Sequence, residues 1–268
     1  MTHPLVAALE ETFQQVRDMD IPLAARLKAI ADKVREQSPV FADAVDDFVG
    51  RLEAAQAGRS APQVGDRMPP FTLPDQDGRL VNMDELLAEA PLIVAFYRGH
   101  WCPYCRLNMV GMAEIQDKVA PAKIVAITQE TRQYTRTLRA EAGADFPFLS
   151  DIGGGYTLSI NLAILVDEFM ASLIESAGWD VPHYQGGTGW LLPVPAVFVI
   201  DMGGTIVARH VDPDYRRRME PSDVLKSLDL LGRVESPDQS AARTKLSSAL
   251  ASRDRARPAT LYTATVRR

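Results

Sequence analysis

The sequence has few cysteines and no long apolar run, and each absence excludes a class of protein. Only two cysteines, Cys102 and Cys105, occur among 268 residues. This excludes a scaffold held together by several disulfides and indicates a reducing compartment. No apolar stretch reaches the about 18 residues that a membrane-spanning helix needs. The first residues also lack the basic and apolar stretches of a secretory signal. We therefore expect a cytoplasmic protein without a membrane span.

Positive charge is scarce except near the end of the sequence. The formal net charge is −6, which argues against a dedicated nucleic-acid-binding protein. Residues 243–268 nevertheless carry seven Lys or Arg and one acidic residue. We predict that residues 236–268 form a basic tail, which could bind acidic partners, although a solvated chain end is the more common role of such a segment.

The first 60 residues have the apolar spacing of helices. Apolar side chains recur at helical intervals in residues 6–16, 23–34 and 41–52, and a proline lies near each new helix start. We predict a helical N-terminal extension over residues 1–60. Its apolar stripes need a partner, which could be the rest of the chain or a second copy in a homodimer.

The middle of the chain alternates between buried strands and helices. Continuous apolar runs at residues 92–97, 124–127 and 196–200 predict buried strands, and the segments 109–119 and 131–141 between them predict helices. The turn 202–204 predicts a hairpin, which a closing helix at 224–231 follows. We expect an α/β fold with a mixed central sheet flanked by helices. An amphipathic helix over 158–177 and a loop at 180–189 predict a helical insertion at about 155–190.

The candidate chemistry lies where the first buried strand ends, in Cys102-Pro103-Tyr104-Cys105. Pro103 suits the first position of a helix, so both sulfurs would lie at the positive end of the helix dipole, which favours a thiolate. Two thiols in one helical turn can also form a small disulfide ring. This favours redox chemistry over a zinc site, which would need two further ligands, because the histidines lack ligand spacing. We expect no metal and no cofactor.

Residues 64–231 resemble the alkyl hydroperoxide reductase/thiol-specific antioxidant family, in a peroxiredoxin-like branch with a thioredoxin-like fold. The resemblance rests on Gly65-Asp66, Phe96 to Gly99, Trp101 to Cys105, Phe146-Pro147, Pro193 to Asp201 and His210 to Tyr215. It implies a thioredoxin-like peroxiredoxin domain over residues 61–235. It also implies a thiol peroxidase that reduces hydrogen peroxide and organic hydroperoxides with electrons from a thioredoxin-like protein. A sulfenic acid would form and condense with the second thiol.

The family pattern assigns roles to several positions, and this sequence departs from the pattern at three of them. The attacking position falls on Cys105, the family's hydroxyl residue is replaced by Cys102, and the polar residue that often follows by three is Asn108. The arginine that the family places before the strand 196–200 is replaced by Pro195, which resembles the cis-proline of thioredoxins. Arg98, where the family has a proline, could supply the missing positive charge and lower the pKa of the thiolate.

This mixture of features leaves alternatives open. By thioredoxin logic Cys102 attacks and the protein exchanges disulfides with other proteins, whereas peroxiredoxin logic, which we favour, makes Cys105 the nucleophile. A non-enzymatic redox sensor would instead use the N-terminal helices and the basic tail. Trp101, Tyr104 and Tyr97 either wall the site or pack in the core. His100 is either a proton shuttle or an exposed loop residue.

Overall fold

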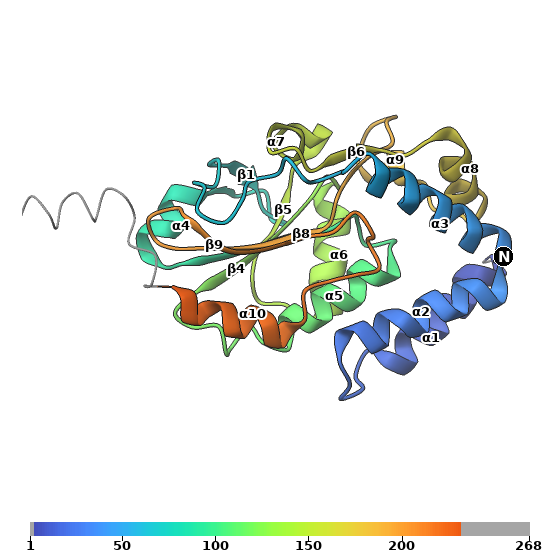
Figure 1. Cartoon of the computed structure of the whole chain (residues 1–268), viewed down its shortest axis with the longest axis horizontal. Helices are drawn as coiled ribbons and strands as arrows, with labels where there is room; N and C mark the ends of the chain where they lie inside the picture. The colour runs from blue at the N-terminus through green and yellow to red at the C-terminus, as the bar shows by residue number, and fades with distance from the viewer. Residues whose placement is uncertain (1–2, 232–268) are drawn as a thin grey trace, which may run out of the picture. The chain divides into compact units, whose positions relative to one another are not determined.

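The computed structural model describes residues 3–231, and its secondary structure alternates strands and helices after three N-terminal helices (Figure 1). The N-terminal helices are α1 (Pro4–Val16), α2 (Leu23–Gln37) and α3 (Pro39–Ala54). Ser38 caps α3 by accepting the N–H of Phe41 at 3.3 Å. The predicted helices and their proline-marked breaks are therefore confirmed. The predicted basic tail lies outside the described residues.

The apolar stripes of the N-terminal helices find their partner within the chain. Leu27 and Ile30 of α2 are buried, as are Leu9 and Phe13 of α1. Both helices contact α5 (Pro103–Ala113), and α3 contacts α8 (Glu168–Ser176). The stripes thus need no second copy of the chain, and the homodimer stays a prediction without this argument. Across residues 3–231, every helix is too short or too polar to span a bilayer.

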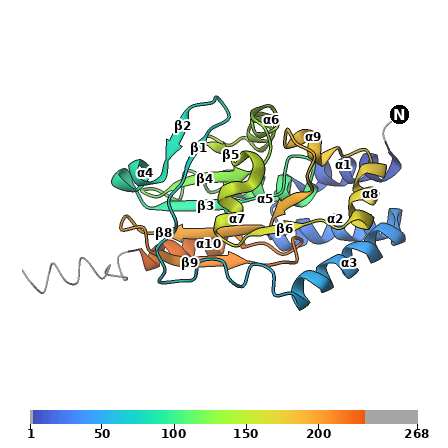
Figure 2. The same cartoon turned by 90° about the horizontal axis from the view of Figure 1, so that it is seen from above.

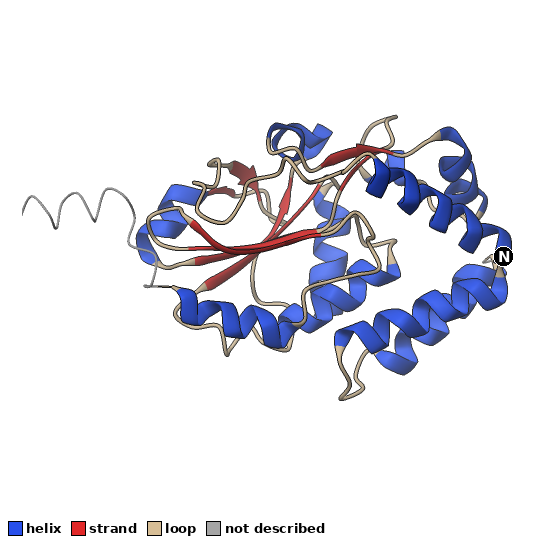
Figure 3. Ribbon diagram, viewed as in Figure 1, coloured by secondary structure: helices blue, strands red, loops and turns tan. Residues whose placement is uncertain are grey.

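A five-stranded mixed sheet with the order β5-β4-β3-β8-β9 forms the centre (Figure 3). Its strands are β3 (Leu92–Phe96), β4 (Lys123–Thr128), β5 (Phe148–Ser150), β8 (Ala196–Ile200) and β9 (Ile206–Val211). β3 pairs parallel with β4 and antiparallel with β8, and β8 and β9 form the predicted hairpin. Every residue of β3 is buried, as expected of a central strand covered on both faces.

Helices cover the two faces of this sheet. α10 (Pro221–Ser227), followed by a 3-10 turn at Leu228–Leu230, lies with α5 on one face, and α7 (Gly155–Ser159) lies on the other (Figure 1). The core on the α7 side includes Val94 and Phe96 of β3. The remaining elements of this region are β1 (Thr72–Pro74), β2 (Leu80–Asn82), α4 (Met83–Glu89) and α6 (Arg132–Ala142). The predicted α/β fold is confirmed.

The region 155–190 differs from the prediction of one long helix. It follows a 3-10 turn at Ile152–Gly154 and contains α7, β6 (Ala163–Leu165), α8 and α9 (Val181–Tyr184). β6 pairs with β7 (Leu191–Pro193). Asn161 has a φ of 57°, which ends α7, and Asp167 caps α8 by accepting the N–H of Met170 at 3.0 Å. The helix predicted over 158–177 is confirmed only over α8, because the end of α7 and the strand β6 take up its first half. The loop predicted over 180–189 is correct except for the single turn of α9.

Candidate active site

The two cysteines lie at the start of α5, directly after the loop that follows β3. Cys102 is the N-cap of α5 and Pro103 its first residue. The Cys102 carbonyl accepts the N–H of Cys105 and that of Arg106, each at 3.0 Å. Both thiols are free, with Cys102 1 % and Cys105 0 % exposed. The predicted position at the electropositive end of a helix is confirmed, and it stabilises a thiolate on either sulfur.

The environment of Cys105 favours its thiolate. Burial raises the pKa of this thiol, but a hydrogen bond with the Cys102 thiol, the charges of Arg218 and Arg98, and the Arg98 backbone N–H together hold it well below its usual range. The Arg98 N–H donates to Cys105 Sγ at 3.3 Å, and Arg218 Nη2 donates to the same sulfur at 3.5 Å. These contacts favour the thiolate on Cys105 rather than on Cys102.

Cys102 has the opposite character. Burial, its hydrogen bond with Cys105 and the negative charge on that sulfur hold the pKa of Cys102 well above its usual range. The two pKa values are therefore shifted in opposite directions, which favours the proton on Cys102 over Cys105. Reversible disulfide formation needs one thiol that ionises easily and a second thiol beside it, and Cys105 and Cys102 have these two characters.

Arg98 contributes to the site in two ways. Its backbone N–H contacts Cys105, and its guanidinium lies 3.9 Å from the ring centre of Tyr215 and 5.0 Å from that of Trp101. The side chain is only 3 % exposed. A buried cation stacked between aromatic rings is held in one orientation, which keeps its positive charge beside the two sulfurs.

Arg218 is the functional candidate that sequence reasoning missed. It follows β9, and 113 positions separate it from the cysteine that it contacts. Its Nε donates to the carbonyl oxygen of Tyr215 at 2.9 Å, which orients the guanidinium. Arg218 stands in a run of three arginines at 216–218, and nothing in that run marks which one faces the site. Its guanidinium supplies a positive charge that the family pattern would place at Pro195.

Pro195 and Asn108 belong to the same part of the fold as the cysteines. Among the described residues, neither one forms a hydrogen bond with a cysteine sulfur. Pro195 precedes β8, one position beyond the pair formed by Phe96 and Ala196, so it stands at the end of the sheet from which the cysteine loop leaves. Its peptide bond is trans, and the predicted cis bond is wrong. Asn108 is buried on α5.

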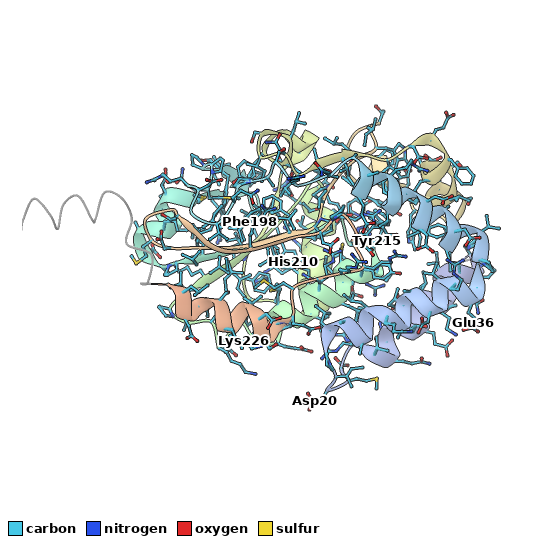
Figure 4. All side chains as sticks on the ribbon, in the orientation of Figure 1. Asp20, Glu36, Phe198, His210, Tyr215 and Lys226 are labelled. Atoms are coloured by element: carbon cyan, nitrogen blue, oxygen red, sulfur yellow. The ribbon has the colours of Figure 1, made fainter. Side chains whose placement is uncertain are left out.

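Aromatic side chains and a cavity adjoin Cys102. Tyr104 packs edge-on against Tyr215, with ring centres 5.4 Å apart. Figure 4 labels Tyr215 between the sheet and the N-terminal helices. Cys102, Pro103, Tyr104 and Trp101 line one end of a cavity of about 240 Å³. Trp101 and Tyr104 therefore wall the site, whereas Tyr97 packs against Phe148 in the core, with ring centres 5.6 Å apart.

His100, in the loop between β3 and α5, pairs with the buried residue Glu130. Glu130 is fully buried, and its carboxylate accepts the backbone N–H of His100 at 2.8 Å and contacts His100 Nδ1 at 2.7 Å. Burial raises the pKa of Glu130, although these contacts oppose the effect. The His100 side chain is 22 % exposed and stacks on Tyr134, so it is not the freely exposed residue of the simpler expectation. Sequence reasoning did not identify Glu130.

The described residues offer no other chemistry of this kind. Within residues 3–231, no three His, Cys, Asp or Glu side chains come together in a way that could hold a metal ion. The candidate site therefore consists of the cysteine pair, Arg98, Arg218 and the aromatic residues of the adjoining cavity.

Comparisons with known proteins identify the family of this chain. The Redoxin family model matches residues 63–228. A thiol:disulfide interchange protein DsbE homolog of Paracoccus denitrificans is 27 % identical over 175 residues, which cover 63 % of this chain and 76 % of that protein. The chloroplastic peroxiredoxin Q of Sedum lineare is 26 % identical over 144 residues, covering 53 % of this chain and 65 % of that one.

Among solved structures, peroxidoxin BcpB from Mycobacterium tuberculosis is 21 % identical, with a TM-score of 0.48 over 65 % of this chain and 99 % of that chain. The family match extends over more than half of the chain. It agrees with the family resemblance that Trp101 to Cys105 carry, and with a mixed central sheet flanked by helices. This chain belongs to the Redoxin family.

Proposed function

We propose that this protein is a thiol-dependent peroxidase that reduces hydrogen peroxide and organic hydroperoxides through Cys105 and Cys102. The observation that carries the proposal is the Cys105 thiol, whose pKa is held low by Arg218, Arg98 and the Cys102 thiol at the start of α5. Peroxide reduction by cysteine begins with a thiolate, and a cation beside it stabilises the negative charge that passes to the leaving oxygen. The peroxiredoxin Q similarity supports the same activity.

In the proposed reaction, the Cys105 thiolate attacks the terminal oxygen of the hydroperoxide. The S–O bond forms as the O–O bond breaks, which leaves a sulfenic acid on Cys105 and an alkoxide that takes the proton of Cys102. The Cys102 thiolate then attacks the Cys105 sulfur and expels hydroxide, which solvent protonates to water. Cys105 has no exposed surface, so the first turn of α5 must move for the peroxide to reach its sulfur.

The disulfide that results has to be reduced for a second turnover. We assign this step to a thioredoxin-like protein, whose dithiol would attack Cys102, the sulfur that lines the cavity. A cytoplasmic location fits this assignment, because thioredoxin and glutathione keep that compartment reducing.

Stopped-flow kinetics of wild type, Cys105→Ser and Cys102→Ser with hydrogen peroxide would test the proposal. We expect Cys105→Ser to lose the fast reaction and Cys102→Ser to keep one turnover that ends in a trappable sulfenic acid. A wild-type protein that reacts no faster than free cysteine would contradict the peroxidase function. Fast reaction of Cys105→Ser would reverse the order of attack.

A second candidate function is thiol–disulfide exchange with other proteins. Two observations favour it: Cys102, rather than Cys105, lines the cavity, and the chain is 27 % identical to a thiol:disulfide interchange protein homolog. This function predicts insulin reduction that depends on Cys102 and a mixed disulfide that accumulates on Cys105→Ser. Failure to trap any mixed disulfide would count against it.

A further inference from the structure

Part of the wall of the cavity beside Cys102 comes from α1, α2 and α3, which lie outside the family match. The match begins at residue 63, yet the cavity is lined by Leu9 of α1, Val34 of α2, and Phe41 and Val45 of α3. α8 adds Met170 and Ile174. Figure 2 shows these four helices gathered at one end of the sheet. The N-terminal helices therefore form much of the wall that faces the candidate active site.

Most of this wall is apolar, and the charged residues Arg35, Asp46 and Arg216 of its lining are held in ion pairs. Arg35 pairs with Asp43 and, at 2.6 Å, with Asp46, and Arg216 pairs with Asp46 at 2.5 Å and with Asp214 at 2.8 Å. The volume of about 240 Å³ exceeds the roughly 150 Å³ of an apolar cavity that binds benzene. The space suits a neutral molecule with one aromatic ring or a branched alkyl group.

The cavity extends to the candidate active site. Cys102, Arg98, Trp101 and Tyr104 are all among the residues that line it. Arg98 is 3 % exposed, and its guanidinium is the buried positive charge beside the two sulfurs. A ligand whose polar end lies toward this part of the cavity is therefore close to both a cation and the cysteine pair.

From these features we infer that the cavity is a substrate pocket for neutral organic hydroperoxides that carry an aryl or branched alkyl group. The apolar body would lie against the N-terminal helices, and the hydroperoxide group would lie toward Arg98 and the cysteines. The N-terminal helices thereby select organic hydroperoxides over hydrogen peroxide. This inference rests on the proposed peroxidase function, in which the bound hydroperoxide becomes the alcohol and the cysteine pair becomes the disulfide.

Binding of an unreactive analogue tests the pocket without any thiol chemistry. We would titrate 2-phenyl-2-propanol, the alcohol formed from cumene hydroperoxide, into the protein and follow tryptophan fluorescence, because Trp101 and Trp179 line the cavity. Ala42→Phe places a ring into the cavity, whereas Val40→Phe adds the same ring at a 65 % exposed position of α3. Wild type and Val40→Phe should respond saturably, and Ala42→Phe should not. An identical response of Ala42→Phe would overturn the inference.

Substrate preference provides the second measurement. The ratio of kcat/KM for cumene hydroperoxide to that for hydrogen peroxide should fall by roughly tenfold or more in Ala42→Phe and stay constant in Val40→Phe. If Ala42→Phe fails to fold, Ala31→Leu narrows the same cavity from α2 at a half-buried position. An unchanged ratio in the folded variant would overturn the selectivity. If the wild type binds the alcohol but does not reduce peroxides, the proposed peroxidase function is contradicted, whereas the proposal that the cavity binds an aryl compound is supported.

Discussion

Replacing Arg218 by methionine should move the titration of Cys105 to higher pH. The guanidinium donates to Cys105 Sγ at 3.5 Å, and its positive charge favours the thiolate. Methionine preserves the length and much of the apolar packing of the arginine side chain but removes the charge. Because the charge lowers the pKa of Cys105, its loss raises that pKa, and the thiolate is then lost at a higher pH as the solution is acidified.

The size of the effect follows from the distance. Two unit charges 3.5 Å apart interact by about 1 kcal/mol in bulk water and about 5 kcal/mol at an effective dielectric constant of about 20. Arg218 is half-buried, so the interaction lies between these limits. Since about 1.4 kcal/mol is a tenfold change in an equilibrium, we expect roughly a tenfold to hundredfold smaller ratio of thiolate to thiol at a fixed pH.

Thiolate absorbance in the ultraviolet would measure this titration. Both Arg218→Met and its parent should carry Cys102→Ser, so that Cys105 is the single titrating thiol. Arg217→Met is the matched control, because it removes an equal charge from a neighbouring side chain that is 62 % exposed and pairs with Glu53. A titration midpoint that does not move in Arg218→Met, or that moves equally in Arg217→Met, would refute the argument.

Two further changes test the neighbourhood of the loop. His100→Leu removes the imidazole 2.7 Å from the buried Glu130 carboxylate. It should lower the free energy of unfolding by roughly 1–3 kcal/mol at neutral pH. The loss should shrink at a pH low enough to protonate Glu130, because burial raises the pKa of this carboxyl and a neutral carboxyl is no longer a buried charge that loses its hydrogen-bond partner. Urea unfolding with equal losses at both pH values would contradict this. Gly99→Ala would place a Cβ 2.5 Å from Trp101 Nε1 and 2.6 Å from Glu130 Oε1, and should destabilise by roughly 1–3 kcal/mol. Gly50→Ala in α3, where a Cβ meets nothing within 4 Å, should stabilise by roughly 0.5–1 kcal/mol. Equal effects of the two alanines on thermal unfolding would refute the steric argument.

Local patterns predicted the elements that carry the cysteines. The apolar run before the loop became β3, and Pro103 marked the start of α5, because both signals act within a few residues of chain. The hairpin of β8 and β9 followed from its short turn for the same reason. The prediction of one continuous helix over 158–177 is incorrect because this region holds a short strand and two short helices. Such short elements lack the length over which apolar periodicity distinguishes a helix from a strand.

The sequence by itself determined that two thiols would share the first turn of a helix after a buried strand, since that arrangement depends on neighbours in the chain. Only the tertiary structure decided which charges surround them. It brought Arg218 to Cys105 across 113 positions, placed Glu130 beneath His100, and set the N-terminal helices over the cavity at Cys102. The electrostatic field at a sulfur depends on distances in space, and packing between elements remote in the sequence sets those distances.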